Sequence, residues 1–338
     1  MTRRRVLGAG LYGTLAAPTW AAGDAAPSSR PALRVGAGQP FARMADALRQ
    51  AVDGDTIEVL PGSYAGDVAV ITQRRLSIVG LGPGGAERPQ FVADGRHAEG
   101  KAIWVVRDGD IRIHNIAFRG ARVPDGNGAG IRFQRGRLQL QRCSFVDNQM
   151  GLLTGNDTAC SLEISDCEFA DAPLNPGSLP HLLYVGRIGH FSLRDSVLRH
   201  GRVGHLVKSR ARESILIGNQ IDDGRTGEAS YEVDLPNGGI ALLEGNTVVQ
   251  SPLTQNTAMV SYGAEGAPWD QNQLTLRGNT FVNHHRPDGF FVRVWADRLP
   301  ADTAVLSERN RLLGPGLLQL GPNGRSVDDQ RGAAPPAD

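Results

Sequence analysis

Residues 204–221, GHLVKSRARESILIGNQI, concentrate groups that could carry out acid–base chemistry. The stretch alternates apolar and polar residues before Gly-Asn-x-Ile, which predicts a strand that runs into a turn. His205, Lys208, Arg210 and Arg212 lie on or beside this strand. A lysine removes a proton only if its pKa falls well below about 10.4, and like-charged neighbours lower it. The same positive charges would attract an anionic ligand.

The composition of the whole chain does not account for this local cluster. Its 338 residues include 36 Lys and Arg against 35 Asp and Glu, a formal net charge of +1. A general nucleic-acid binder normally shows a basic excess, so we expect no nucleic-acid partner. The 43 glycines and the low aromatic content indicate many turns rather than many helices.

The first 26 residues are typical of an export signal. A basic start is followed by a mildly apolar stretch rich in Gly and Ala, and small residues surround positions 21–26. TRRRVL resembles the twin-arginine export signal, and an ordinary secretory signal is the alternative. No later stretch is long and apolar enough to span a bilayer. The sequence therefore predicts a periplasmic or secreted protein, which we expect to be a monomer.

Eight segments repeat one template: apolar, x, apolar, x, x, a key residue, x, apolar. LQLQRCSF, LEISDCEF and LTLRGNTF are examples, and successive key residues lie 23 to 33 residues apart. The key residues are Ile116, Cys143, Cys167, Ser196, Asn219, Asn246, Asn279 and Asn310. A second short strand lies between successive copies. No such unit can bury its own apolar face, so the units must stack.

The period predicts an all-β fold, a single-stranded right-handed parallel β-helix over residues 35–320. The asparagines at the key position then form an internal ladder, because amides about 4.8 Å apart can hydrogen-bond along the stack. Cys143 and Cys167 fall on neighbouring rungs, where buried small residues are favoured over a disulfide. Residues 321–338 lack periodicity, and we expect a disordered tail there.

A short helix should cover the open N-terminal end of the solenoid. Residues 39–53, QPFARMADALRQAVD, place apolar side chains at helical spacing, and bare strand edges would invite aggregation. GDTIEVLPGSYAGDV follows directly. A short amphipathic helix that leads into this motif resembles the N-terminal cap of pectate-lyase-like β-helix proteins, and the resemblance implies their right-handed parallel β-helix.

Outward residues on successive rungs should form columns. Aligning the apolar positions of the second strands puts five residues in one column, preceded by Thr154: Tyr184, Lys208, Asp234, Ser261 and Arg293. His181 and His205 fall three residues before two of them. Such a strip, about 20 Å long, suits a linear polymer, and its positive members indicate an anionic one. We therefore expect an acidic polysaccharide as the partner.

On this strip, LVKSRARESILIGNQI resembles the β-helical alginate and chondroitin lyases over one rung. The resemblance implies that Lys208 is the base, that an Arg on the next rung is the acid, and that calcium neutralises the substrate carboxylate. The chain departs from that pattern, because its next rung reads SYEVDLPNGG and offers Asp234 instead of Arg. His205 or Tyr231 would then be the acid, with Arg293 a further alternative.

Carboxylates beside the strip could hold the calcium ion. Asp234 and Glu232 offer the oxygen ligands that Ca²⁺ prefers. Six residues are candidate substrate contacts: Tyr184, His181, Arg210, Arg293, Ser261 and Trp269, with Trp269 as a platform for a sugar ring. Glu265 could approach the strip from a neighbouring rung.

A lyase that cleaves a uronate-containing polysaccharide by β-elimination is the function this sequence favours. A uronate epimerase uses the same proton abstraction. A glycoside hydrolase needs two carboxylates at a defined separation, and only Asp222-Asp223 and Gly204-His205-Leu206 partly match such an enzyme on this fold. A non-catalytic carbohydrate-binding solenoid needs the strip but no base.

Overall fold

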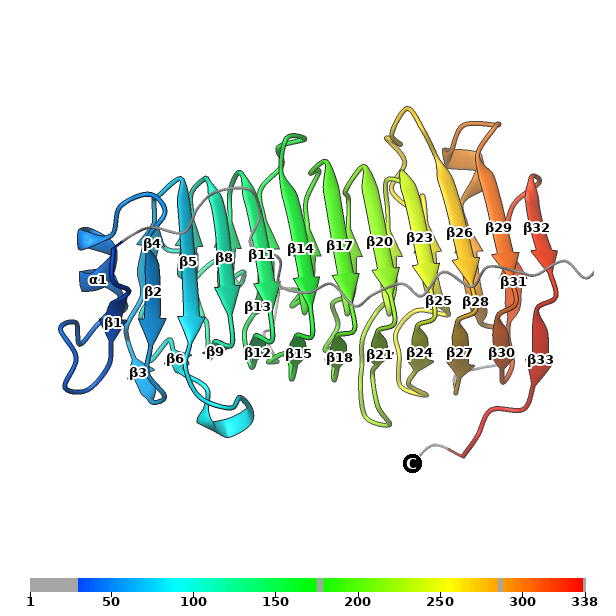
Figure 1. Ribbon diagram of the computed structural model, residues 1–338. Coiled ribbons are helices and arrows are strands. Elements are labelled where there is room, and N and C mark those ends of the chain that lie inside the picture. Colours follow the sequence, from blue (N-terminus) through cyan, green and yellow to red (C-terminus); the bar gives the residue numbers. More distant parts are fainter. Residues whose placement is uncertain (1–29, 175–178, 285–287, 337–338) are drawn as a thin grey trace, which may run out of the picture.

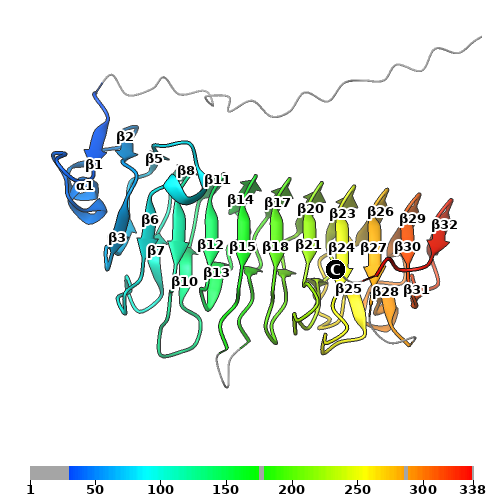
Figure 2. The ribbon, with the colours of Figure 1, turned by 90° about the horizontal axis from the view of Figure 1, so that it is seen from below.

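The computed structural model describes residues 30–174, 179–284 and 288–336 (Figure 1). The export signal expected in residues 1–26 lies outside these residues. In the described part of the chain the strands form three parallel sheets of 12, 11 and 10 strands. Each complete coil contributes one strand to each sheet, the coils at the two ends are incomplete, and all coils stack along one axis (Figures 1 and 2). The predicted all-β, right-handed parallel β-helix is confirmed.

The first sheet, called sheet A here, contains β1 (Leu33–Val35), β2 (Thr56–Val59), β5 (Arg75–Gly80), β8 (Asp110–His114), β11 (Arg137–Gln141), β14 (Ser161–Ser165), β17 (His190–Arg194), β20 (Glu213–Ile217), β23 (Ile240–Glu244), β26 (Gln273–Arg277), β29 (Ala304–Glu308) and β32 (Gly324–Val327). Sheet B contains β3 (Ser63–Ala65), β6 (Gln90–Val92), β9 (Ala117–Arg119), β12 (Ser144–Val146), β15 (Glu168–Ala170), β18 (Val197–Arg199), β21 (Gln220–Asp222), β24 (Thr247–Gln250), β27 (Thr280–Asn283), β30 (Arg311–Leu313) and β33 (Gln330–Gly332).

Sheet C carries the predicted strip. It contains β4 (Ala69–Ile71), β7 (Ala102–Val106), β10 (Ala129–Phe133), β13 (Met150–Thr154), β16 (Leu183–Val185), β19 (Val207–Ser209), β22 (Val233–Leu235), β25 (Ala258–Tyr262), β28 (Phe290–Val294) and β31 (Leu317–Gln319). Two 3₁₀ turns, Gly85–Glu87 and Ala296–Arg298, lie in connections.

The core is a narrow apolar column between the three sheets. Alternate residues of each strand point inward, and the parallel register stacks side chains at equivalent positions from rung to rung. Phe118, Phe145 and Phe169 show this, with ring centroids 5.1 Å and 4.7 Å apart and nearly parallel planes. Because each rung packs mainly on its two neighbours, the positions of outward side chains are fixed by the register of the sheets.

The asparagine ladder lies at the turn between sheets A and B. Asn219 Nδ2 donates to Asn246 Oδ1, Asn246 Nδ2 to Asn279 Oδ1, and Asn279 Nδ2 to Asn310 Oδ1, each at 2.9 Å. The backbone N–H of the same residues also donates to the next amide oxygen. The predicted ladder is confirmed, and the column continues toward the N-terminus through Ser196.

Sulfur replaces the amide on earlier rungs of this column. The Ser196 hydroxyl accepts a hydrogen bond from the Cys167 N–H, and Cys167 Sγ accepts one from the Cys143 N–H. Cys143, Cys160 and Cys167 are all buried free thiols. The expectation of buried small residues in place of a disulfide is confirmed.

The N-terminal cap is a shorter helix than the periodicity indicates. Helix α1 covers Met44–Gln50, and Met44 and Leu48 are buried on the first rungs. Its Met44 N–H donates to Asp67 Oδ2 at 2.7 Å. Phe41 precedes the helix in an extended bridge, and Val52 follows it with an exposed side chain. The chain leaves the helix at Ala51, which has extended backbone angles.

The C-terminal segment differs from the sequence expectation. Residues 324–332 are not disordered, because β32 and β33 pair with β29 and β30 and extend sheets A and B by one strand each. Asp329 closes the asparagine ladder by accepting the N–H and Nδ2–H of Asn310 at 2.8 and 2.9 Å. The lack of strong apolar alternation hid this rung, whose residues are largely exposed.

Among the described residues, none of the helices has the length and apolar character that a membrane crossing requires.

Candidate functional site on sheet C

The register of sheet C confirms the predicted column. Tyr184 pairs with Lys208, Lys208 with Asp234, Asp234 with Ser261, and Ser261 with Arg293. We call these five residues the sheet C strip. Val207 and Val233 are buried on the opposite face of the same strands, so the strip residues must point outward.

The residue that precedes Tyr184 in the column is Leu153, not Thr154. Thr154 instead turns toward the backbone, where its hydroxyl donates to Gly155 O and accepts from Gly186 N–H. Arg132 precedes Leu153. The column of outward side chains therefore includes a cation two rungs before Tyr184, which the sequence alignment of the second strands did not include.

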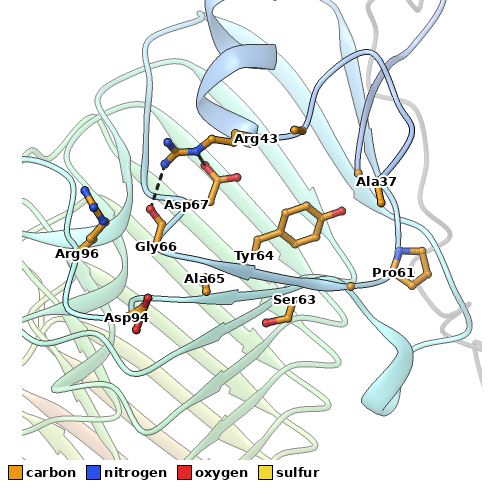
Figure 3. Close-up of a pocket in the computed structure, with 13 residues that line it drawn as sticks. Ala37, Arg43, Pro61, Ser63, Tyr64, Ala65, Gly66, Asp67, Asp94 and Arg96 are labelled. Carbon is orange, nitrogen blue, oxygen red and sulfur yellow. Dashed lines mark hydrogen bonds and ion pairs between the residues drawn. The ribbon is translucent and has the colours of Figure 1, made fainter.

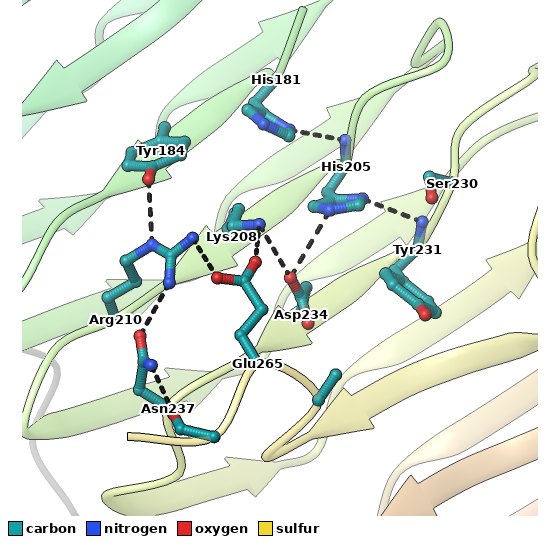
Figure 4. Close-up of polar contacts among 12 residues, drawn as sticks. His181, Tyr184, His205, Lys208, Arg210, Ser230, Tyr231, Asp234, Asn237 and Glu265 are labelled. Atoms are coloured by element: carbon teal, nitrogen blue, oxygen red, sulfur yellow. Dashed lines mark hydrogen bonds and ion pairs between the residues drawn. The ribbon is translucent and has the colours of Figure 1, made fainter. Parts of the chain in front are cut away.

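Lys208 lies between two carboxylates (Figure 4). Its Nζ is 3.3 Å from Asp234 Oδ2 and 2.8 Å from Glu265 Oε1. Asp234 comes from the next rung, whereas Glu265 comes from residues 263–272, which connect β25 to β26. The lysine side chain is only 9% exposed. The arrangement fixes the ammonium group above the centre of the strip.

Arg210 is held on three sides. Its Nε donates to the Tyr184 hydroxyl at 2.9 Å, its Nη1 donates to Asn237 Oδ1 at 2.8 Å, and its Nη2 pairs with Glu265 Oε2 at 2.6 Å. Lys208 and Arg210 thus hold the two oxygens of one carboxylate (Figure 4). Burial opposes the ionisation of Glu265, but the hydrogen bonds from Lys208 and Arg210 keep the pKa of Glu265 below its usual value.

Two histidines line the other side of the strip in a chain of hydrogen bonds. The His205 N–H donates to His181 Nδ1 at 2.8 Å, and the Tyr231 N–H donates to His205 Nδ1 at 3.2 Å. Burial lowers the pKa of His181 to about 3 and that of His205 well below its usual value. Both rings are therefore neutral near pH 7, and their hydrogen-bond partners place the proton on Nε2.

Asp234 is the one carboxylate among the five residues of the strip. Its Oδ2 contacts Lys208 and lies 3.5 Å from His205 Nε2, while Oδ1 has no hydrogen-bond partner among the described residues. Burial raises the pKa of Asp234 to about 6, against the opposing effect of Lys208. Partial burial, and then the charge of Asp234, raise the pKa of the Tyr231 phenol. The strip therefore holds a carboxylate that ionises near neutral pH beside a protonated phenol.

Glu232 does not join Asp234. It is fully buried, and its Oε2 accepts a hydrogen bond from Gln250 Nε2 at 3.1 Å. Burial, with a further contribution from Asp223, raises its pKa well above the usual value. The described residues contain no group of three His, Cys, Asp or Glu side chains placed to hold a metal ion. A buried neutral carboxyl group and a lysine-paired aspartate do not fit the expected calcium site.

The remaining predicted contacts occupy the edges of the strip. Trp269 is an anchor of the 263–272 connection, because its Nε1 donates to Arg210 O and its ring lies 4.1 Å from the Arg187 guanidinium. The arginine thus covers the ring that was expected to stack on a sugar. Arg293 lies over the Trp295 ring at 3.9 Å.

Sequence reasoning missed several residues that complete the site. Asn237 fixes both Arg210 and the 263–272 connection, since its Nδ2 donates to Gly266 O at 2.7 Å. The Pro-Asn-Gly-Gly sequence at 236–239 does predict an unusual turn beside the strip, but it does not identify the partners of the Asn237 amide. Arg187 and Trp295 carried no sequence signal, because their roles depend on contacts with distant segments.

A separate hollow of about 780 Å³ lies at the N-terminal end of the molecule (Figure 3). It is lined by residues from 36 to 96, among them Tyr64 and Arg96. Arg43 reaches across it to Gly66 O at 3.2 Å and to Asp67 at 3.6 Å. These contacts connect helix α1 to the first coils, which indicates a role in attaching the cap.

Comparison with solved structures finds proteins of similar fold. A protein of Geobacillus virus E2, ORF18, is 12% identical over 85% of this chain and 55% of its own, with a TM-score of 0.53. This chain therefore spans about half of the viral protein. The A-module of the mannuronan C-5 epimerase AlgE4 from Azotobacter vinelandii is 11% identical over 86% of this chain and 89% of its own, with a TM-score of 0.52. Pectate lyase Pel9A is 11% identical over 90% and 78%, with a TM-score of 0.38.

No protein-family model matches the chain. No curated protein sequence matches it either. The three parallel sheets, together with the likeness to the viral protein and to the epimerase module, show that the chain has a right-handed parallel β-helix fold.

Proposed function

We propose that this protein is an exported enzyme that cleaves a uronate-containing polysaccharide by β-elimination. One observation carries the proposal: the buried carboxylate of Asp234, whose pKa is raised to about 6, contacts Lys208 on the strip, and Lys208 shares Glu265 with a second fixed cation, Arg210. β-Elimination needs a base for the proton next to the uronate carboxylate and positive charge to stabilise the enolate that forms. The strip offers both.

In this proposal Lys208 and Arg210 neutralise the substrate carboxylate. The sequence favoured Lys208 as the base, but its Nζ is shared between Asp234 and Glu265, an environment that suits a fixed ammonium group. Arg210 cannot lose its proton and presents Nη2 on the same side. Two cations around one carboxylate stabilise the additional negative charge of the enolate.

Asp234 is then the base, and Tyr231 is the acid. Asp234 Oδ1 takes the proton from C5 of the uronate, the electrons form the C4–C5 double bond, and the C4–O4 bond breaks. The Tyr231 hydroxyl donates its proton to the departing O4. A base works best when its pKa is near the operating pH, which favours Asp234. His205 orients Asp234 through Nε2–H, and His181 orients His205.

Epimerisation at C5 is the second candidate, favoured by the likeness to the A-module of a mannuronan C-5 epimerase over most of both chains. It begins with the same removal of the C5 proton. The two reactions differ in the fate of the enolate, which either expels O4 or receives a proton on the opposite face. No step in either proposal uses calcium, because the predicted ligands do not converge. We further propose that the protein works as a monomer in the periplasm or outside the cell.

The test is incubation of the mature protein with alginate, pectate, glucuronan and chondroitin, with and without Ca²⁺. Absorbance of the new conjugated double bond reports elimination, and proton NMR of the uronate residues reports epimerisation. Lys208→Met should lower kcat/KM by about 100-fold or more, since it removes a charge that acts in the transition state. Lys208→Arg should retain part of the activity, because it keeps the charge.

Glu163→Gln, which removes an ion pair with Arg137 on sheet A, is the matched control and should leave activity unchanged. Loss of activity in Lys208→Arg equal to that in Lys208→Met would return the role of base to Lys208. Absence of both products across the panel, with polymer binding retained, would make the protein a non-catalytic binding solenoid.

A further inference from the structure

Glu265 places a carboxylate between Lys208 of the strip and the neighbouring Arg210. Oε1 lies 2.8 Å from Lys208 Nζ and Oε2 lies 2.6 Å from Arg210 Nη2. A bidentate carboxylate is the ligand that such a pair of donors recognises best. The question is whether Glu265 belongs permanently to the site or occupies the place of another carboxylate.

Both cations are positioned without Glu265. Asp234 holds Lys208, and the Tyr184 hydroxyl and Asn237 hold two of the three guanidinium nitrogens of Arg210. Each cation therefore keeps at least one N–H donor for a further anion, and a donor of each points to Glu265 (Figure 4). A site that stays formed when its occupant leaves is preorganised for another carboxylate.

The backbone around Glu265 is fixed by contacts that its side chain does not make. The Glu265 N–H donates to Pro236 O at 2.9 Å, and Asn237 Nδ2 donates to Gly266 O at 2.7 Å. Trp269 and Arg187 anchor the far part of the connection. Rotation of the Glu265 side chain can therefore empty the site while the connection stays in place.

Solvent exposure favours exchange of this carboxylate. The Glu265 side chain is 44% exposed, whereas the Lys208 side chain is 9% exposed. Ion pairs made by a partly solvated carboxylate contribute little net free energy. Replacing Glu265 by another carboxylate would also keep Lys208 and Arg210 paired, so the buried cation is never left alone.

We propose that Lys208 and Arg210 form a carboxylate-binding subsite that Glu265 fills in the free protein, and that a uronate carboxylate binds there by displacing the Glu265 side chain. This inference rests on the proposed function for the identity of the ligand. Glu265 is then an internal competitor for Lys208 and Arg210.

The test measures binding of uronate monosaccharides, which contain no glycosidic bond to cleave. Glucuronate, galacturonate and mannuronate are titrated by calorimetry into the full-length mature protein, and glucose, galactose and mannose serve as the neutral controls at equal ionic strength. Glu265→Gln and Glu265→Ala should each bind at least one uronate roughly fivefold more tightly than the native chain, because an exposed ion pair is worth at most about that factor. The neutral sugars should show no such gain.

Control variants separate competition from a general effect of charge. Glu163→Gln removes a carboxylate of similar exposure on sheet A and should bind like the native chain. The gain in Glu265→Gln should disappear when Arg210→Gln is added. Unchanged or weaker uronate binding in both Glu265 variants would overturn the proposal, and so would an equal gain for inorganic sulfate.

The two proposals fail independently. Tighter uronate binding in the Glu265 variants, with no product from any polymer, would leave the subsite standing and remove the lyase. Elimination by the native chain, without a gain in the Glu265 variants, would leave the lyase standing and make Glu265 a fixed part of the site.

Discussion

Asp234 shows how the surroundings of one residue set the chemistry of the strip. Burial disfavours its charge, Lys208 restores part of it, and Oδ1 remains without a hydrogen-bond partner among the described residues. The sequence placed Asp234 in the correct column but assigned it to calcium. It could not reveal that His205 Nε2 faces Asp234, because the Tyr231 N–H, which donates to His205 Nδ1, places the ring proton on Nε2.

A pH profile tests this residue. The pKa of Asp234 is raised from 3.8 to about 6, so the carboxylate that accepts a proton becomes the major form only above that pH. We expect kcat/KM for the active polymer to rise about tenfold per pH unit below pH 6 and to level off above it. Asp234→Asn should abolish the reaction at every pH. A flat profile between pH 4.5 and 7 would assign the base to another residue.

The identity of the strip residues was predictable, whereas their partners were not. Alternation within the second strands identified Tyr184, Lys208, Asp234, Ser261 and Arg293, since inward residues of parallel strands must stay in register. The contact between Lys208 and Glu265 joins residues 57 positions apart through an irregular connection. Glu232 was misplaced because its side chain lies in the buried interior beside Gln250, just before β22 begins.

At the scale of elements, the asparagine ladder connects the coils at the turn between sheets A and B. Asn246 accepts the N–H and the Nδ2–H of Asn219, and it donates to Leu216 O and Asn279 Oδ1. Each buried amide therefore satisfies backbone groups of its neighbours. The repeated key position in the sequence predicted this element because the same hydrogen-bond requirement recurs on each rung from Asn219 to Asn310.

Substitution of one ladder residue should be costly. Asn246→Ala leaves the Asn219 N–H and Leu216 O buried without their partner, and each such group costs about 1–3 kcal/mol. We expect a loss of roughly 3 kcal/mol in the free energy of unfolding, measured by denaturant titration. Gln220→Ala, at the exposed first position of β21 in the preceding coil, should change stability by less than about 0.5 kcal/mol. Equal effects of the two variants would argue against the ladder as a source of stability.

The two ends of the β-helix were harder to predict than its repeated coils. Helix α1 ends before Val52, although the apolar spacing continues, because Asp53 and Gly54 begin the turn into β2. The last rung at 324–332 has few buried apolar residues, so no periodic signal marked it. Backbone pairing and the Asp329 cap define that rung instead.

At the scale of the whole molecule, the stack must end in edges that do not pair with other chains. Helix α1 packs against β1 and β4 and covers the N-terminal end of the core (Figure 1). Met44, the first residue of α1, is fully buried, and its N–H donates a hydrogen bond to Asp67. An exposed strand edge at this position would offer unpaired backbone groups to a second molecule.

Displacing the cap should therefore cause association. Met44→Glu places a charge in the buried interface of α1, and we expect concentration-dependent oligomers in size-exclusion chromatography with light scattering. Val52→Glu adds the same charge at a side chain that is 51% exposed, and it should remain as monodisperse as the native chain. A monodisperse Met44→Glu protein with an unchanged melting temperature would show that the cap does not protect this edge.

The connection between β25 and β26 enters and leaves the solenoid at one corner. On both sides of it the sheets keep their register, so residues 263–272 do not determine the order of the coils. Changes of length or composition in this segment can therefore alter which ligands reach Lys208 and Arg210 without changing the register of the coils. In evolution, such a corner lets one inherited scaffold acquire new substrate preferences by exchange of a single loop.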